Sequence, residues 1–217
     1  MVSQARSEAT RQKILDAAID VFSEVGYAAA GLGEIIERAG MTKGALYHHF
    51  DSKETLATAI IEQGSTLTSD AFQHVCESSS PALENMIHGA FVVTDLLVSD
   101  KKARTAEQLT RALAEFNPAA AQVWNNRLTA MTTQANRANT EGDLREDLDP
   151  HLVSESILNA MLGAQLLSTT AHGNDHINRL TRSLELLLPA IVTDTALAYF
   201  GEFLARESLR QTTYSTN

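Results

Sequence analysis

One stretch of this chain limits its possible folds more than any other, residues 31–53, which read GLGEIIERAGMTKGALYHHFDSK. In its first half, apolar residues recur at spacings of three and four, which predicts a short helix with one apolar face. These residues are Leu32, Ile35, Ile36 and Ala39. Gly40 follows, and a glycine there can adopt the left-handed conformation that ends a helix.

A second short helix is expected after Thr42, whose hydroxyl can accept a hydrogen bond from an unpaired amide of the first turn. Leu46 and Phe50 are four residues apart and would pack inward, whereas Lys43 and Tyr47 share a different side. Two helices joined by a glycine-containing turn, the second with a polar outer face, are typical of a helix-turn-helix.

Helices are also expected on both sides of this pair. An upstream apolar stripe predicts a helix over about residues 8–24 that ends at Gly26 and braces the pair. Downstream, Asp51 and Glu54 have capping-box spacing, with Asp in the usual Ser or Thr position. A long helix should follow to about Glu77, with Gly64 as an interruption.

Prolines divide the remainder into further helical stretches. Three of them follow a potential capping residue and are therefore expected at the first position of a helix: Ser80–Pro81, Asn117–Pro118 and Asp149–Pro150. Gly142 should close the second of these helices, a shorter helix is predicted near residues 101–114, and Pro189 should break another. A last helix near 193–208 precedes a loose tail. No strand alternation is found, so the predicted fold is all-α with nine or ten helices.

Composition narrows the class of protein. The net charge is −10, but residues 1–53 hold six bases and seven acids, a net of −1, so any contact with phosphate there must come from a few placed groups. The single cysteine, Cys76, excludes an internal disulfide and is interpreted as a small apolar residue on a helix. The polar N-terminus and the lack of a membrane-length apolar run predict a cytoplasmic protein with no membrane partner.

The run TKGALYHHF-x-SKE-x-L, residues 42–56, resembles the DNA-binding signature of the tetracycline-repressor (TetR) family of transcriptional regulators. The segments ILDAAIDVFSEVGY, TKGALYHHF and SKETLA are similar to the γ-butyrolactone autoregulator receptors. The resemblance implies a DNA-binding domain over residues 1–53 and a ligand-binding and dimerisation domain over 54–217. It further implies a homodimeric repressor that binds a pseudo-palindromic operator and is released by a small hydrophobic, γ-butyrolactone-like effector. Residues 150–170 and those from Ile177 onward would form the dimer bundle.

The front of the second short helix supplies the candidate DNA contacts. They are Thr42, Lys43, Ala45, Tyr47 and His48, together with Lys53, which resembles the family's phosphate clamp. The alternative for this set is an ordinary solvated helix face, and His49 is expected to pack inside. The chain departs from the family pattern at Ala30–Gly31, where a Thr or Ser is common, so one hydroxyl for the phosphate backbone is missing.

Candidate effector contacts lie on later apolar stripes. Trp124, the only tryptophan, is interpreted either as core or, from a pocket tryptophan at a similar place in the butyrolactone receptors, as part of the pocket. The adaptable apolar candidates are Met86, Phe91, Met131 and Met161. Thr94, Gln108 and Gln165 are polar groups suited to orient a lactone carbonyl or hydroxyl, with water-facing positions as the alternative.

No enzyme, cofactor or metal site is expected. The sequence contains no glycine-rich phosphate loop, G-x-S-x-G or H-E-x-x-H motif, and residues 172–176, HGNDH, are interpreted as a solvated loop rather than a metal site. Two alternative functions stay open at this point. The first is the same DNA-binding repressor with a fatty-acyl, antibiotic or other lipophilic effector, and the second is a helical protein-interaction module.

Overall fold

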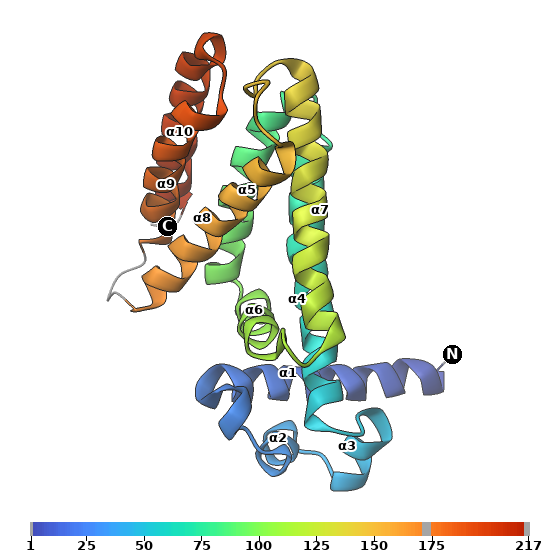
Figure 1. The fold of residues 1–217 in the computed structure, drawn as a ribbon. Coiled ribbons are helices and arrows are strands. Elements are labelled where there is room, and N and C mark those ends of the chain that lie inside the picture. Colours follow the sequence, from blue (N-terminus) through green and yellow to red (C-terminus); the bar gives the residue numbers. More distant parts are fainter. Residues whose placement is uncertain (1, 171–174, 215–217) are drawn as a thin grey trace. The chain divides into compact units, whose positions relative to one another are not determined.

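Ten α-helices make up the described part of the computed structural model, residues 2–170 and 175–214 (Figure 1). They are α1 (Val2–Ala29), α2 (Leu32–Ala39), α3 (Lys43–His49), α4 (Lys53–Cys76), α5 (Ala82–Ser99), α6 (Lys101–Leu113), α7 (Pro118–Glu141), α8 (Pro150–Thr170), α9 (His176–Ile191) and α10 (Asp194–Tyr214). Across those residues the only strand-like pairing is an isolated bridge between Leu144 and Val192, so the all-α prediction is confirmed. None of the described helices is both long enough and apolar enough to span a bilayer.

The chain forms two compact units. The first contains residues 1–67 and 99–123, and the second contains residues 68–98 and 124–217. Helices α4 and α7 have residues in both units. The predicted boundary at residue 53 separates the chain by function and stays a prediction, since by contacts the first unit also includes the start of α4 and all of α6.

A single apolar core joins the helices of the first unit. Its fully buried members include Ile14, Leu15, Ala18 and Val21 of α1, Ile35 of α2, Leu46 of α3, and Leu56, Ile60 and Ile61 of α4. From α6, Ala106 and Leu109 complete the same cluster. Gly64 lets α4 approach α6 closely, because a Cβ atom at this position would lie 2.2 Å from the Cβ atom of Ala106. The predicted interruption at Gly64 is therefore wrong, and α4 continues to Cys76.

Glycines with positive φ stand where the sequence predicted helix ends. The φ angles are 76° at Gly26, 60° at Gly40 and 84° at Gly142. At Gly26 the backbone leaves the helical conformation, and a further helical turn leads to Ala29. Helix α1 begins at Val2, earlier than expected, because nothing in its polar first turns interrupts a helix.

Two of the three predicted caps before proline are present. Asn117 Oδ1 accepts a hydrogen bond from the Ala120 amide at 3.1 Å, and Asp149 Oδ1 accepts one from the His151 amide at 2.9 Å. At Pro81 the prediction is wrong by one residue, because α5 begins at Ala82. There the Glu141 carboxylate, at the end of α7, accepts a hydrogen bond from the Ala82 amide at 2.6 Å.

The start of α4 differs from its prediction in the same way. Ser52 and Thr55, rather than Asp51 and Glu54, form the reciprocal cap. The Ser52 amide donates to Thr55 Oγ1 at 3.1 Å, and the Thr55 amide donates to Ser52 Oγ at 3.1 Å. Adjacent residues can both cap a helix, and local spacing alone does not choose between them.

The C-terminal helices extend further than the sequence indicated. Pro189 lies inside α9, which ends at Ile191, so the expected break is wrong. A proline in the last turn removes only one hydrogen bond, and buried Leu188 and Ile191 keep that turn packed. The tail expected to be loose is helical to Tyr214. In the second unit α9 packs between α8 and α10, over a core that includes Leu180, Leu184 and Phe200.

Candidate DNA-binding surface and effector cavity

Helices α2 and α3 form a helix-turn-helix whose turn is fixed by its own backbone. The Gly40 amide donates to the Glu37 carbonyl at 2.9 Å, and the Met41 amide donates to the Ile36 carbonyl at 3.1 Å. Thr42 Oγ1 then accepts from the Ala45 amide at 3.2 Å and begins α3, as predicted.

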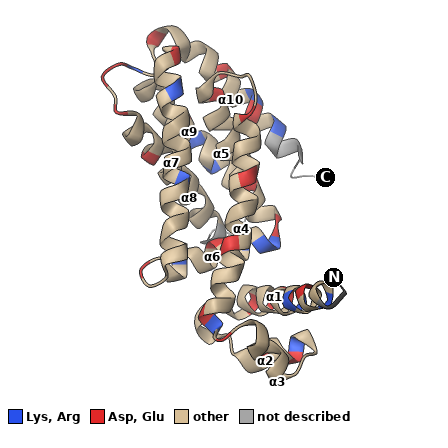
Figure 2. Cartoon of the chain, turned by 90° about the vertical axis from the view of Figure 1, so that its right-hand side faces the viewer, with Lys and Arg blue, Asp and Glu red and all other residues tan. Residues whose placement is uncertain are grey.

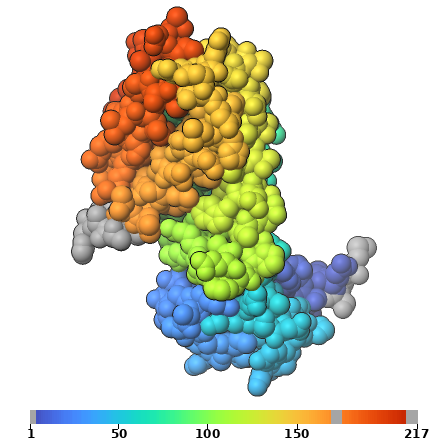
Figure 3. All heavy atoms as spheres, in the orientation of Figure 1, coloured from blue at the N-terminus to red at the C-terminus, as the bar shows by residue number. Residues whose placement is uncertain are grey.

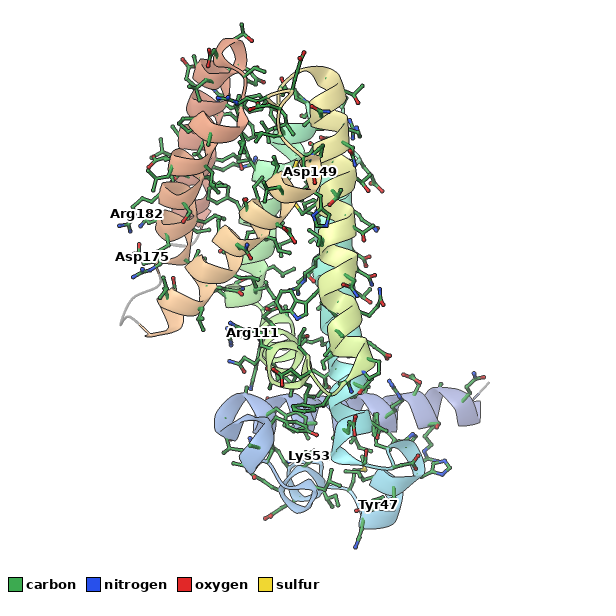
Figure 4. The ribbon with its side chains drawn as sticks, in the orientation of Figure 1. Tyr47, Lys53, Arg111, Asp149, Asp175 and Arg182 are labelled. Atoms are coloured by element: carbon green, nitrogen blue, oxygen red, sulfur yellow. The ribbon has the colours of Figure 1, made fainter. Side chains whose placement is uncertain are left out.

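One side of α3 is buried and the other is exposed. Leu46 and Phe50 are buried in the core of the first unit. Lys43 and His48 are exposed, and Tyr47 retains 42% of its exposure. Figure 4 shows Tyr47 projecting away from the other helices of this unit. The polar groups predicted to contact DNA therefore share an accessible surface.

The residues of this surface differ in how freely their side chains could contact DNA. Thr42 is exposed, although its hydroxyl oxygen already accepts the capping hydrogen bond. Ala45 is half-buried and offers only a methyl group. The Lys43 ammonium lies 5.7 Å from the centre of the Tyr47 ring and makes no ion pair within the described residues. Its charge is thus free to meet a phosphate or a guanine edge.

Lys53 does not lie with this set. Its ammonium donates to the carbonyl oxygens of Tyr27 at 2.8 Å, Ala30 at 3.0 Å and Ala28 at 3.4 Å, and it stands 4.5 Å from the centre of the Tyr27 ring. An ammonium has three donors, and these carbonyls use all of them. In this structure Lys53 joins the start of α4 to the end of α1 (Figure 4), and its role as a phosphate clamp stays a prediction.

Other basic residues of the first unit are also engaged internally. Arg38 donates to Glu24 at 2.5 Å and lies 3.5 Å from Glu34. The hydrogen bond from Arg38 lowers the pKa of the Glu24 carboxyl. Arg11 stacks over the Phe50 ring at 5.2 Å and so ties α1 to the end of α3. Blue and red residues alternate along α1 in Figure 2, in keeping with the near-neutral charge of this region.

Helix α2 begins at Gly31 without a side-chain cap. Gly31 is in an extended conformation, with φ −107° and ψ 142°, which any residue can adopt. A Ser or Thr could therefore adopt the backbone conformation of Gly31. Without its hydroxyl, the candidate DNA surface has one polar group fewer.

Three of the predicted effector residues meet at a small cavity in the second unit. Thr94 of α5 and Met161 and Gln165 of α8 line it together with Arg127 of α7. Its volume is about 10 Å³, which leaves space for one water molecule at most. The guanidinium of Arg127 stacks over the Trp124 ring at 5.0 Å, so half-buried Trp124 is linked to the same place.

The remaining effector candidates lie elsewhere. Met86, Phe91 and Met131 are buried but are not among the residues that line this cavity. Gln108 is exposed on α6 in the first compact unit and does not line this cavity, so its part in effector binding stays a prediction. Periodicity placed it on a polar helix face but carried no information about which unit that face belongs to.

Residues 172–174 of the HGNDH segment lie outside the described residues. Asp175 forms ion pairs with Arg179 and Arg182 at 3.5 and 3.1 Å. His176 is buried, with its ring 3.6 Å from Asp95, so the solvated-loop interpretation is wrong for this residue. Burial lowers the pKa of His176 and favours the neutral ring. No group of three or more His, Cys, Asp or Glu side chains suited to a metal ion is found where the structure is described.

Similarity to known proteins extends beyond the helix-turn-helix. Residues 14–60 match the profile described as "Bacterial regulatory proteins, tetR family". Over 201 residues the chain is 30% identical to the A-factor receptor protein of Streptomyces griseus, which covers 92% of this chain and 70% of that protein. The crystal structure of a gamma-butyrolactone receptor (ArpA-like protein) has a TM-score of 0.78 at 26% identity and covers 94% of this chain and 99% of that one. The TetR family protein CprB from Streptomyces coelicolor, in complex with its biological operator sequence, has a TM-score of 0.77 at 27% identity, covering 94% and 99%.

Proposed function

Because this chain belongs to the TetR family of bacterial regulatory proteins and resembles γ-butyrolactone receptors within it, we propose that it is a homodimeric repressor released from its operator by a small lactone effector. Proteins of this family are DNA-binding transcription regulators and not enzymes. The chain is accordingly a transcriptional repressor, and the proposal concerns its effector, its assembly and the residues that act.

The observation that carries the proposal is the accessible polar side of α3. Lys43, Tyr47 and His48 project from a helix that Thr42 begins and that Leu46 and Phe50 anchor. A helix held in this way can enter the major groove with its first turns against the base edges. Lys43 would reach a guanine or a phosphate, and the Tyr47 hydroxyl would donate to a phosphate oxygen.

Apolar exposure on α8 and α9 supports a homodimer. Leu166 and Leu167 of α8 are 54% and 53% exposed, and Leu186 of α9 is 82% exposed. Small residues of α8, including Ala160 and Gly163, line a groove of about 310 Å³ beside Leu167. Figure 3 shows α8 at the surface. A second copy of the chain would cover these side chains, and its two-fold symmetry would match an operator of two inverted half-sites.

The cavity between α5, α7 and α8 supports a hydrogen-bonding group on the effector. Thr94 Oγ1 and Gln165 Oε1 are buried and make no hydrogen bond within the described residues. Leaving a buried polar group unpaired costs about 1–3 kcal/mol, so a ligand that satisfies both would recover this energy. The Thr94 hydroxyl can donate to a lactone carbonyl, and the Gln165 oxygen can accept from a ligand hydroxyl.

The present size of this cavity indicates how the effector would act. At about 10 Å³ it is too small for a lactone, so binding requires α5, α7 and α8 to separate. Helices α4 and α7 continue into the unit that holds the helix-turn-helix and would carry the change to it. Release from DNA then follows if the effector has higher affinity for the opened conformation than for the DNA-binding one.

DNA binding tests the first part of the proposal. A duplex selected from a random-sequence pool should contain inverted repeats and bind two chains in a salt-dependent manner. Lys43→Ala should weaken binding and lower the salt slope by about 0.9 per subunit, and Tyr47→Phe should cost about 1 kcal/mol of binding energy. Neither change should alter the unfolding midpoint. Failure to enrich any duplex at low salt would contradict the proposal.

Fluorescence of the single tryptophan tests the effector. Titration with γ-butyrolactones that carry a hydroxyl should change Trp124 emission and release the duplex, whereas fatty acids and unrelated lipophiles should do neither. Gln165→Leu should weaken the lactone response and leave DNA binding unchanged, with Gln73→Leu on the exposed side of α4 as the control. A response to lipophiles but not to lactones would retain the repressor and reject this effector class.

A further inference from the structure

Helices α1 and α6 enclose a second cleft, within the first compact unit, that the proposed function does not use. Its volume is about 290 Å³. The Phe22 and Tyr27 rings of α1 line it, with centroids 5.7 Å apart, opposite Gln108 and Ala112 of α6. The Lys101 ammonium, 2.5 Å from Asp20 Oδ1, holds the start of α6 to α1.

The lining is uncharged and combines aromatic walls with a few polar atoms. None of its residues is Asp, Glu, Lys, Arg or His, so nothing in the cleft compensates a charged ligand. The volume is at the lower end of small-molecule pockets, which suits one or two fused rings better than a long acyl chain. The pair of aromatic rings favours a flat partner.

Hydrogen bonds already made by the lining decide what kind of polar group can bind. Ser23 Oγ donates to the Asp20 carbonyl at 2.8 Å, and Thr105 Oγ1 donates to the Lys101 carbonyl at 2.8 Å. Each hydroxyl has only one proton, so both oxygens can act only as acceptors, and because Thr105 has no exposed surface it is Ser23 that can accept from a ligand. The Gln108 side-chain amide makes no hydrogen bond within the described residues and adds a second accessible acceptor oxygen besides its own donors.

From this pattern we propose that the α1–α6 cleft is a binding site for a small neutral aromatic molecule that carries an O–H or N–H donor. The ring lies against Phe22 and Tyr27, and its donor meets Gln108 or the hydroxyl oxygen of Ser23. The site is distinct from the cavity that contains Thr94 and Gln165, because the two belong to different compact units.

Three related probes test the class of ligand by calorimetry on the full chain. The first, 2-naphthol, has the ring and the donor; 2-methoxynaphthalene has the ring but no donor; 2-naphthoate carries a charge. We expect 2-naphthol to bind, its methyl ether to bind threefold to tenfold more weakly, which is the value of one hydrogen bond, and 2-naphthoate not to bind at the same concentrations. Equal binding of 2-naphthol and its ether, or no binding of 2-naphthol up to millimolar concentration, would overturn the proposal.

Variants of the chain then locate the site. Gln108→Ala should lower the affinity for 2-naphthol by about threefold to tenfold and reduce the preference for 2-naphthol over 2-methoxynaphthalene. Gln73 is a matched exposed glutamine on α4, and Gln73→Ala should change neither quantity. Ala112→Phe should fill the cleft and abolish binding, with a helical circular dichroism spectrum as the check on folding. Should Ala112→Phe fail to fold, Gln108→Ala alone decides. Parent-like binding by Gln108→Ala, or loss of binding on Gln165→Ala, would place the ligand elsewhere and refute the site.

Discussion

The Lys53 ammonium offers a sharp test of whether this side chain serves the fold or the DNA. Lys53→Met keeps an unbranched apolar stem of similar length and removes the charge with its three donors. Two of the hydrogen bonds lost, to the Tyr27 and Ala30 carbonyls, are 2.8 and 3.0 Å long, and the third, to Ala28, is 3.4 Å. The contact with the Tyr27 ring at 4.5 Å is lost as well.

The size of the effect follows from these contacts. A hydrogen bond from a charged donor contributes about 1.5–3 kcal/mol, and a cation–π contact near the surface about 0.5–1 kcal/mol. Lys53 is half-buried, and exposed Ala28 can return its carbonyl to water, so the contributions do not add in full. We expect Lys53→Met to lower the free energy of unfolding by about 2–3 kcal/mol, which is roughly 5–10 °C in the midpoint for a chain of this length.

Two measurements separate this role from that of a phosphate clamp. Urea unfolding of the full chain gives the stability, and the dependence of operator affinity on salt gives the number of phosphates neutralised. An internal role for Lys53 predicts a loss of stability with an unchanged salt slope in the folded protein. Lys43→Met is the matched control, since it should lower the slope by about 0.9 per subunit and leave unfolding unchanged. Unchanged unfolding of Lys53→Met with a reduced slope would refute the reasoning.

Two further predictions concern stability. Ser52→Ala should destabilise the chain by about 1 kcal/mol in urea unfolding, because it removes a capping partner of Thr55, whereas Asp51→Ala should stay within about 0.5 kcal/mol; equal effects would contradict the observed cap. Although burial acts in the opposite direction, hydrogen bonding and attraction from His88 lower the pKa of the Glu207 carboxyl below its ordinary value of 4.5. This stabilisation is present above pH 4.5 and is lost as the pH falls through the lower folded-state pKa. The stability advantage of the parent over Glu207→Gln should therefore shrink as the pH falls below about 4.5.

Local rules explain what the sequence predicted well. Gly40 ends α2 and Thr42 begins α3. Both helix ends depend only on residues within four positions of the cap, so the local sequence is enough to predict them. The same holds for Asn117 and Asp149, which cap the helices after them. The exposed side of α3 follows from periodicity alone, once Leu46 is assigned to the core.

The structure adds most where contacts distant in sequence decide the position of a residue. Lys53 meets carbonyls 23–26 residues earlier in the chain, and no local pattern indicates such a partner. Gln108 has the polarity of a pocket residue but lies on a helix that belongs to the other unit. At Pro189, packing of the neighbouring apolar residues outweighed the lost hydrogen bond. In each case the residue type and its local spacing do not indicate which parts of the fold it will contact.

The internal use of basic residues sets a limit on how the protein can hold DNA. Of the six bases in residues 1–53, Arg11, Arg38 and Lys53 are engaged with Phe50, with Glu24 and with backbone carbonyls. Arg6, Lys13 and Lys43 make no ion pair within the described residues, so each subunit can neutralise about three phosphates. A dimer would then show a salt slope no steeper than about −5, well below the slope of about −10 shown by strongly electrostatic repressors. With so little non-specific attraction, affinity for the operator would depend on contacts to bases and, in the proposed homodimer, on both subunits binding together. A small change in the spacing of the two heads would then be sufficient for release.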